Sequence, residues 1–173
     1  SEIGSVPIPK TVKEAMASKH WPLFKAAKEE EIAGKMANGA WVVKPRPLRK
    51  HVMKSKWVFT VKYNDDGSIK RVKTRIVACG YSQTPDEYTK IFAATLPGVS
   101  ARFLLSCIAD EDLETDHIDA VKAFTQADID CELYVEMPEG FKIDNYVLLL
   151  LKALEGIRQG AALWFKHNRE ALT

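Results

Sequence analysis

The stretch KWVFTVKYNDDGSIKRVKTRIVA, residues 56–78, determines the fold that the sequence predicts. Its first half alternates large apolar residues with smaller or polar ones, and the large ones are Trp57, Phe59, Val61 and Tyr63. This two-residue period is typical of a strand with one buried face. Asn64-Asp65-Asp66-Gly67 is a strong turn signal, and a second alternating run follows it. The stretch therefore predicts a β-hairpin.

The second strand of this predicted hairpin has two chemically different faces. One face is basic and carries Arg71, Lys73 and Arg75. The other face carries Val72, Thr74, Ile76 and Ala78. The basic face predicts contacts with nucleic-acid phosphates, and an ordinary solvated surface is the alternative.

Capping residues predict two helices on the N-terminal side of the hairpin. Thr11 can cap a short helix that runs to about Ser18, and Pro22 suits the first turn of a second helix. Asn38-Gly39 would close that second helix. Residues 1–10 are predicted to be an N-terminal tether.

The C-terminal side of the hairpin predicts further helices and strands. Ser100 is expected to cap a helix with an apolar seam of Phe103, Leu104, Cys107 and Ile108. A short strand should lead to Asp119, and two more should follow, one with Leu133, Val135 and Met137 and one over residues 146–151. A final helix would carry Ala161, Trp164, Phe165, Asn168 and Leu172. The predicted class is therefore α+β, with an antiparallel sheet and packed helices.

The charge distribution is uneven, although the formal net charge of the 173 residues is only +2. Residues 44–75 contain eleven basic and two acidic side chains, and the segment 110–119 contains six acidic ones. A basic half beside an acidic centre suits a polyanion that metal ions bridge to the protein. A surface pattern without a role is the alternative.

The cysteines and the hydropathy of the sequence predict the cellular compartment of the protein. Cys79, Cys107 and Cys131 are odd in number and far apart, which predicts reduced thiols in a cytoplasmic or nuclear protein. No signal peptide or membrane span is visible, because the apolar run 147–151 is far too short to cross a bilayer. No membrane partner is therefore expected.

The segment His117-Ile118-Asp119-Ala120-Val121-Lys122-Ala123-Phe124 carries the strongest chemical signal. Its acidic residue ends a strand-like run, and a small residue and an aromatic residue follow. This pattern suits a metal-bound triphosphate, because the carboxylate binds a hard cation and the following backbone lies against the phosphates. The aromatic ring would form a floor under the sugar. Taken singly, Asp119 would more often be a turn residue, Phe124 a core residue and Gln159-Gly160 a turn.

Further motifs follow one another from about Trp21 to Leu172: EEEI at 29–32, Asn38 with Trp41, KWVF at 56–59, DGSI at 66–69, KTRIVA at 73–78 with Gly80 and Gln83, Phe92-Ala93, LYVE at 133–136 with Pro138 and Gly140-Phe141, and Leu154 with Gly156, Gln159 and Trp164. In order and spacing, they resemble the reverse transcriptase domain of copia-type retrotransposons. The resemblance implies a right-hand polymerase in which residues 11–173 form the fingers and the first part of the palm.

The resemblance also implies roles for single residues. Asp119 would be the first catalytic aspartate and a ligand of both Mg²⁺ ions in two-metal nucleotidyl transfer, with the Ala120 carbonyl as a further ligand. Phe124 would exclude a ribose 2′-hydroxyl group and so select deoxynucleotides. The other implied nucleotide contacts are Lys73 and Arg75 over the triphosphate, the backbone amides of Lys122 and Ala123, and Gln159 beside the sugar and base.

The implied activity is the extension of a primer on an RNA or DNA template with dNTPs and Mg²⁺. A polymerase of this family needs a second acidic motif, Tyr-x-Asp-Asp, downstream of the last helix, and the sequence does not contain it there. Tyr63-Asn64-Asp65-Asp66 has the same letters, but its place between two strands and before Gly67 predicts an exposed turn. This chain alone is therefore expected not to polymerise.

Four other positions depart from the family pattern: Cys79 replaces the usual lysine, Glu155 a tyrosine, Ala161 a proline and Ala162 an arginine. Two interpretations stay open. The chain is a piece of an RNA-directed DNA polymerase, or it is a degenerate or domesticated module that keeps the fold and binds nucleic acid or protein without catalysis. The sequence also leaves open whether the chain has a protein partner or forms an oligomer.

Overall fold

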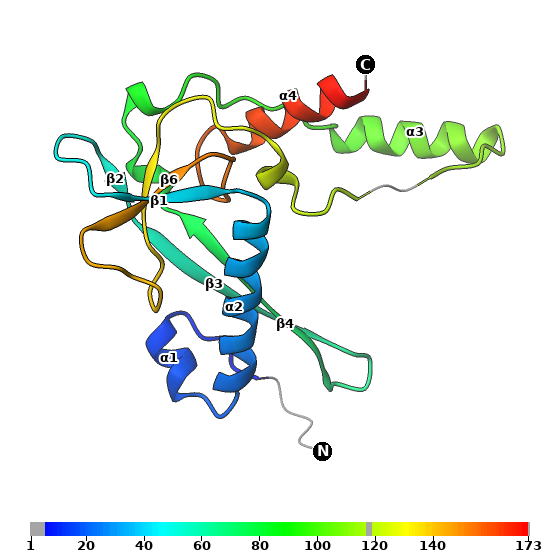
Figure 1. Ribbon diagram of the computed structural model, residues 1–173. Helices are drawn as coiled ribbons and strands as arrows, with labels where there is room; N and C mark the ends of the chain where they lie inside the picture. Colours follow the sequence, from blue (N-terminus) through cyan, green and yellow to red (C-terminus); the bar gives the residue numbers. More distant parts are fainter. Residues whose placement is uncertain (1–5, 117–118, 173) are drawn as a thin grey trace.

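The structure is a computed structural model that describes residues 6–116 and 119–172. Over these residues it combines a four-stranded sheet, a separate two-stranded hairpin and helices (Figure 1). The predicted α+β class is therefore confirmed. Within the same residues, no helix is both long and apolar enough to cross a membrane.

The predicted hairpin consists of β3, Ser55–Tyr63, and β4, Ile69–Ala78, which pair antiparallel with Trp57 opposite Ile76. Asp65 and Asp66 lie exposed in the turn between these strands, as the sequence predicts. The carboxylate of Asp66 closes the turn by accepting hydrogen bonds from the backbone N–H and the hydroxyl of Ser68. The apolar face is buried and comprises Trp57, Phe59, Val61, Ile76 and Ala78.

The four-stranded sheet has the order β1–β6–β5–β2. Its strands are β1, Trp41–Pro45; β6, Tyr146–Leu150; β5, Tyr134–Glu136; and β2, Val52–Met53. The β1–β6 and β5–β6 pairs are antiparallel, as predicted, but β2 and β5 pair in parallel. The prediction of an antiparallel sheet is therefore wrong for β2 and β5. A single residue separates β2 from β3, so the chain does not turn back between them and β2 keeps the chain direction of β3.

The two N-terminal helices begin and end where the sequence predicts. In α1, Val12–Ala17, the side chain of Thr11 accepts a hydrogen bond from the Glu14 N–H group. In α2, Trp21–Ala37, Pro22 occupies the first turn and Asn38 is the C-cap. Both helices therefore form from local capping signals.

Aromatic packing joins α2 to the hairpin. The rings of Phe24 and Phe59 meet edge to face, with their centroids 5.5 Å apart. Val6, inside the segment predicted as a tether, is also buried, and its carbonyl accepts a hydrogen bond from the Tyr63 hydroxyl. This part of the predicted tether is thus packed against the hairpin, and residues 1–5 lie outside the described residues.

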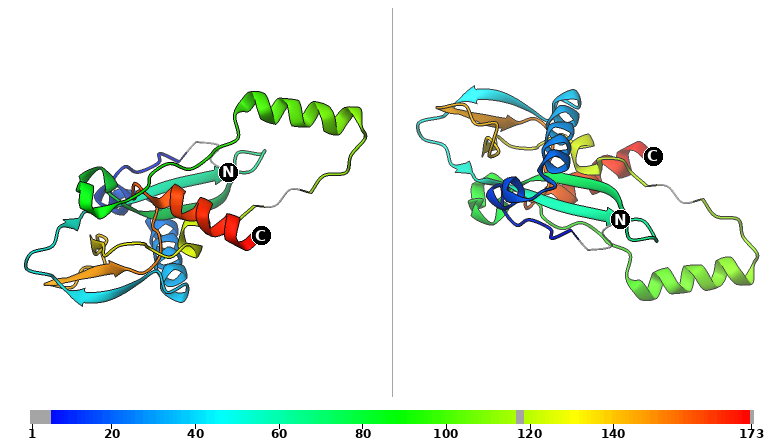
Figure 2. Two further views of the ribbon diagram at one scale, coloured as in Figure 1. Left: turned by 90° about the horizontal axis from the view of Figure 1, so that it is seen from above. Right: turned by 90° about the horizontal axis from the view of Figure 1, so that it is seen from below.

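Helix α3, Gly98–Asp110, differs from its prediction in two details. It begins with Pro97 as N-cap, so Ser100 lies in the first turn and does not cap the helix. The proline already fixes the backbone at the helix start, which explains the earlier beginning. The predicted apolar seam is not packed, since Phe103 and Leu104 are 71% and 53% exposed. Figures 1 and 2 show α3 apart from the rest of the chain.

Two further predictions concern the flanks of the C-terminal region. Residues 113–116 do not form the strand expected before Asp119, and His117-Ile118 lie outside the described residues. Helix α4, Gly160–Leu172, confirms the predicted final helix. Among its described residues only Gly160 is buried, so its apolar side chains pack less than the pattern suggests.

The loop between β6 and α4 crosses the end of β4 with almost no space between the two backbones. Gly156 has a φ of +93°, and a Cβ atom added there would lie 2.2 Å from the Ala78 carbonyl oxygen. We expect Gly156→Ala to lower the free energy of unfolding by at least about 3 kcal/mol, because the new side chain needs both strain and a backbone shift. Urea denaturation would measure this loss.

Gly39→Ala is the matched control. Gly39 also has a positive φ, +61°, but a Cβ atom there would meet open space. The control should therefore cost only about 1 kcal/mol, from backbone strain alone. Equal losses in the two variants would show that the close approach at Gly156 has no energetic weight.

Candidate functional site

A cavity of about 470 Å³ lies between α2, β4 and the segment 119–124. Eight of the nine residues predicted for the site line this cavity, although they belong to two segments far apart in sequence. They are Arg71, Lys73, Arg75, Asp119, Ala120, Lys122, Ala123 and Phe124. Gln159 is the exception, because it is fully buried and does not line the cavity.

A tight turn at its C-terminal end fixes the conformation of the segment 119–124. The turn is η3, Ala123–Gln126, and Lys122 precedes it with a left-handed backbone, φ +53°. Such a backbone costs about 1 kcal/mol or more for a residue other than glycine, and is often found at functional sites. The buried Thr125 holds it in place, because its N–H group and its hydroxyl both donate to the Lys122 carbonyl at 3.0 Å.

A glycine in α2 gives room to the Lys122 side chain. A Cβ atom added at Gly34 would lie 2.5 Å from the Lys122 Nζ atom. The side chain therefore reaches from the segment 119–124 to α2, where its charge acts on Glu31. The two walls of the cavity are linked by this contact.

Asp119 is the cavity carboxylate that is available to a cation. It is exposed and makes no hydrogen bond or ion pair with the other described residues. Glu30 is paired with Arg71 at 3.0 Å, and Glu155 is paired with a lysine of α2. Mg²⁺ prefers carboxylate and carbonyl oxygens, so Asp119 and the Ala120 carbonyl fit one part of a magnesium site. Over the described ranges, no group of three His, Cys, Asp or Glu residues completes such a site.

A buried ion pair closes one wall of the cavity. The side chain of Lys35 is 2% exposed, and its Nζ atom lies 2.6 Å from Glu155 Oε2 and 3.8 Å from Glu31 Oε1. Burial raises the pKa of Glu31, and the attraction of Lys35 offsets part of this effect. Glu31 Oε1 is buried without a hydrogen-bond partner among the described residues. Glu155 thus neutralises a lysine whose burial no sequence signal indicates.

The remaining basic groups of the cavity are available to an anion. The lining has five basic and four acidic side chains. Arg71 and Lys35 are paired with carboxylates, whereas Lys73, Arg75 and Lys122 form no ion pair within the described part of the chain. The cavity can therefore hold an anion against β4 and a cation against Asp119 at the same time.

Lys35→Met removes the buried ammonium group and nearly keeps the side-chain shape. We expect the free energy of unfolding to fall by about 3–5 kcal/mol, because Glu31 and Glu155 would then lie together without a cation. Urea denaturation at neutral pH would measure the loss.

Lys25 offers a matched control on the same helix. It is 60% exposed and lies 4.0 Å from Glu29. Lys25→Met should therefore change the free energy of unfolding by at most about 0.5 kcal/mol. Similar losses at the two positions would contradict a structural role for the buried pair.

Known proteins share the sequence of this region. Residues 38–173 match the family described as reverse transcriptase (RNA-dependent DNA polymerase). Similar proteins are the retrovirus-related Pol polyproteins from transposons RE1 and RE2 of Arabidopsis thaliana, 34% and 33% identical over 170 residues. The Pol polyprotein from transposon TNT 1-94 of Nicotiana tabacum is 32% identical over 161 residues.

These matches cover 95%, 95% and 91% of this chain but only 11%, 11% and 12% of the three relatives. No solved structure matches the chain. The family match includes β4, the segment 119–124 and Glu155, and so every cavity wall except α2. The resemblance to copia-type retrotransposon enzymes is thereby confirmed, and the chain belongs to the reverse transcriptase (RNA-dependent DNA polymerase) family.

Proposed function

We propose that residues 11–173 form the fingers and the first part of the palm of an RNA-directed DNA polymerase. In this proposal the cavity binds the incoming deoxynucleoside triphosphate. The observation that carries it is the meeting of eight predicted residues around one cavity, seven of them assigned from the family resemblance and Arg71 from the basic face of its strand. Local structure alone would not bring β4 to the segment 119–124.

Each wall of the cavity would contact a different part of the nucleotide. Lys73 and Arg75 would bind the triphosphate from β4, and the N–H groups of Lys122 and Ala123 would donate hydrogen bonds to its oxygens. The ring of Phe124 would lie under the sugar and exclude a 2′-hydroxyl group. Phosphates and sugar would thus be fixed from separate segments of the chain.

Asp119 and the Ala120 carbonyl would hold Mg²⁺, which when bound neutralises phosphate charge and aligns the primer hydroxyl. Five basic and four acidic side chains line the cavity, so their net charge is +1. This charge is too small to neutralise a triphosphate. A two-metal site needs more than one carboxylate, so the described residues would supply one part of it. A nucleotide contact by Gln159 stays a prediction.

The basic face of β4 is also proposed to contact the RNA or DNA template-primer. Arg71 would exchange its exposed partner Glu30 for a phosphate, at little cost, since exposed ion pairs are weak. Phosphate contacts carry no base specificity, so none is expected. The cytoplasmic or nuclear location, and any protein partner or oligomer, stay predictions.

Nucleic-acid binding by residues 1–173 should be weak and sensitive to salt. Each phosphate contact contributes a slope of about −0.7 to −0.9 in log affinity against log salt. Replacing Arg71, Lys73 and Arg75 together by alanine should lower the affinity and flatten the slope by about two units. Fluorescence anisotropy over a salt series would measure both quantities.

A charge-matched control removes three exposed lysines elsewhere, namely Lys13, Lys25 and Lys166. This control should change the slope much less. If both triple variants keep the slope of the unsubstituted chain, the β4 face is an ordinary solvated surface.

Primer extension is the experiment that tests the proposed activity. A longer chain that includes a Tyr-x-Asp-Asp motif should extend a primer with Mg²⁺ and dNTPs. Asp119→Asn should lower the rate about 10²-fold or more, because it keeps the shape and removes the charge. Asp66→Asn is the control and should leave the rate unchanged, since Asp66 closes an exposed turn. Phe124→Ala should admit ribonucleotides.

Residues 1–173 alone should show no extension, even when folded. Robust extension by this segment would contradict the incomplete metal site. An active longer chain that is indifferent to Asp119→Asn would overturn the assignment of Asp119. A folded longer chain without any extension would favour the non-catalytic binding module.

A further inference from the structure

One buried oxygen in the wall of the cavity lacks a hydrogen-bond partner. Among the described residues, Glu31 Oε1 is the buried side-chain oxygen or nitrogen atom without such a partner. The ammonium group of Lys35 lies 3.8 Å from it, which is too far for a hydrogen bond, and lies 2.6 Å from Glu155. The Glu31 carboxyl group therefore lacks part of the hydrogen bonding that a buried charge needs.

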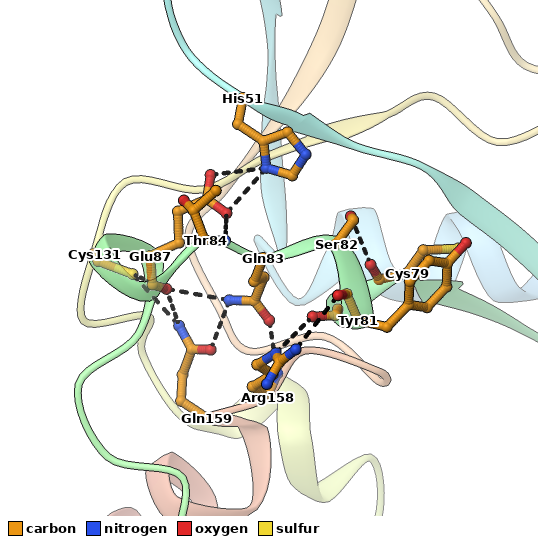
Figure 3. A network of polar contacts seen from close by, with 11 residues as sticks. His51, Cys79, Tyr81, Ser82, Gln83, Thr84, Glu87, Cys131, Arg158 and Gln159 are labelled. Carbon is orange, nitrogen blue, oxygen red and sulfur yellow. Dashed lines mark hydrogen bonds and ion pairs between the residues drawn. The ribbon is translucent and has the colours of Figure 1, made fainter.

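Elsewhere the fold supplies partners to its buried polar side chains. Gln83 and Gln159 are buried, and the Gln83 Nε2 group donates a hydrogen bond to Gln159 Oε1 at 2.9 Å (Figure 3). The Gln159 Nε2 group donates in turn to the Glu87 carbonyl at 3.0 Å. Because native structures leave few buried polar atoms unsatisfied, each exception needs a physical explanation. Glu31 is such an exception, and it lines the cavity.

The groups around Glu31 decide how readily its carboxyl group takes up a proton. Burial raises the pKa of this group above its usual value. The charge of Lys35 lowers the pKa, and the charge of Glu155 raises it. The Ile76 N–H group and the charge of Lys122 lower it. Burial outweighs the rest, so Glu31 binds a proton more readily than an exposed glutamate does. The other charged groups that line the cavity are Glu30, Arg71, Lys73, Arg75 and Asp119.

Glu31 lies between the two segments that are proposed to bind the triphosphate. Helix α2 packs against β4, where the Thr74 hydroxyl donates to the Ala27 carbonyl at 2.8 Å and the Ile76 N–H group acts on Glu31 (Figure 1). From the segment 119–124, the side chain of Lys122 reaches α2. A triphosphate bound between these segments would approach Glu31. Its oxygens would repel an ionised carboxylate, whereas they would accept a hydrogen bond from a protonated one.

We propose that Glu31 binds the triphosphate as a carboxylic acid, by donating a hydrogen bond from its O–H group to a phosphate oxygen. This role rests on the proposed function, which places a nucleotide in the cavity. The proton removes the charge for which Oε1 has no partner, and it turns a repulsive contact into a favourable one. With Glu31 neutral, the charge of the cavity lining rises from +1 to +2. Nucleotide binding and proton uptake by Glu31 are thus linked.

The affinity for dTTP with Mg²⁺ should depend on pH through this carboxyl group. A bound triphosphate favours the protonated form, so the pKa of Glu31 is higher in the complex than in the free protein. Binding is therefore strongest below the free value, and between the two values the affinity falls by up to about tenfold for each unit of rising pH. Isothermal titration calorimetry of residues 1–173, in buffers of different ionisation enthalpy, would count the protons taken up.

Glu31→Gln keeps the side-chain size and a hydrogen-bond donor but cannot titrate. Because the phosphates of dTTP titrate as well, the decisive quantity is the difference between the two chains. Within the pH window of the linkage, the variant should take up fewer protons by up to about one for each nucleotide bound. Its affinity should equal or exceed that of the unsubstituted chain. Glu29→Gln is the matched control, since Glu29 is 58% exposed on the same helix, and it should leave the proton count unchanged.

Two results with these variants would overturn the proposal. The first is an equal proton count in Glu31→Gln and in the unsubstituted chain over the whole pH series. The second is a lower affinity of Glu31→Gln at every pH, which would show that the ionised carboxylate is needed, as it would be for a cation ligand.

A measurement without substitution follows the carboxyl carbon of Glu31 by ¹³C NMR at constant pH within that window. Addition of dTTP and Mg²⁺ should move this signal toward the position of the protonated acid. A move toward the ionised position would overturn the proposal.

Inorganic tripolyphosphate separates this role of Glu31 from the proposed function. If tripolyphosphate binds with proton uptake by Glu31 but dTTP with Mg²⁺ does not bind, the role of Glu31 stands and the nucleotide site is wrong. If both bind without this uptake, the role of Glu31 alone is wrong. If neither binds, both proposals are wrong.

Discussion

The ion pair between Lys35 and Glu155 is the interaction on which the cavity depends. It joins the last turn of α2 to the loop that follows β6, with 2.6 Å between the ammonium nitrogen and the carboxylate oxygen. The carbonyl of Glu155 also accepts a hydrogen bond from the Ala78 N–H group at the end of β4. Helix, loop and strand end are therefore fixed at one place. Because a separated charge is costly in the interior, the pair holds the loop against α2. The Thr74 hydroxyl of β4 also donates a buried hydrogen bond to the Ala27 carbonyl of α2 at 2.8 Å, which joins the helix to the strand directly.

The pairing of charges also decides which groups can act on a ligand. Carboxylates already match Lys35 and Arg71, so the charges without an ion pair among the described residues are those of Lys73, Arg75, Lys122 and Asp119. An anion alone would be repelled by Asp119, and a cation alone would be repelled by the three basic side chains. A metal ion bound to an anion satisfies both sets of groups together. The electrostatics of the cavity thus favour a metal-bound phosphate over either ion by itself.

Local signals in the sequence were sufficient for the hairpin, its turn and the caps of α1 and α2, because each depends on residues a few positions apart. The cap predicted at Ser100 was wrong because Pro97 already fixes the backbone there. The parallel pairing of β2 with β5, and the burial of Lys35, depend on which distant segments meet, and no local pattern reports this. Family motifs identified both sides of the cavity, but they gave no indication that Gln83 would engage the amide of Gln159.

Two aspartates show why the letters of a motif do not define a metal ligand. Tyr63-Asn64-Asp65-Asp66 spells the acidic motif of a polymerase, yet β3 and β4 place its carboxylates at an exposed hairpin tip. Hydrogen bonds from Ser68 hold the pKa of Asp66 below its usual value, so its carboxylate is already occupied in closing a turn. Asp119 has no such partner among the described residues, and it shares a cavity with unpaired cations. The chemistry open to Asp66 and to Asp119 therefore follows from the partners that the fold leaves to each, and of these two it is Asp119 whose carboxylate a ligand can use.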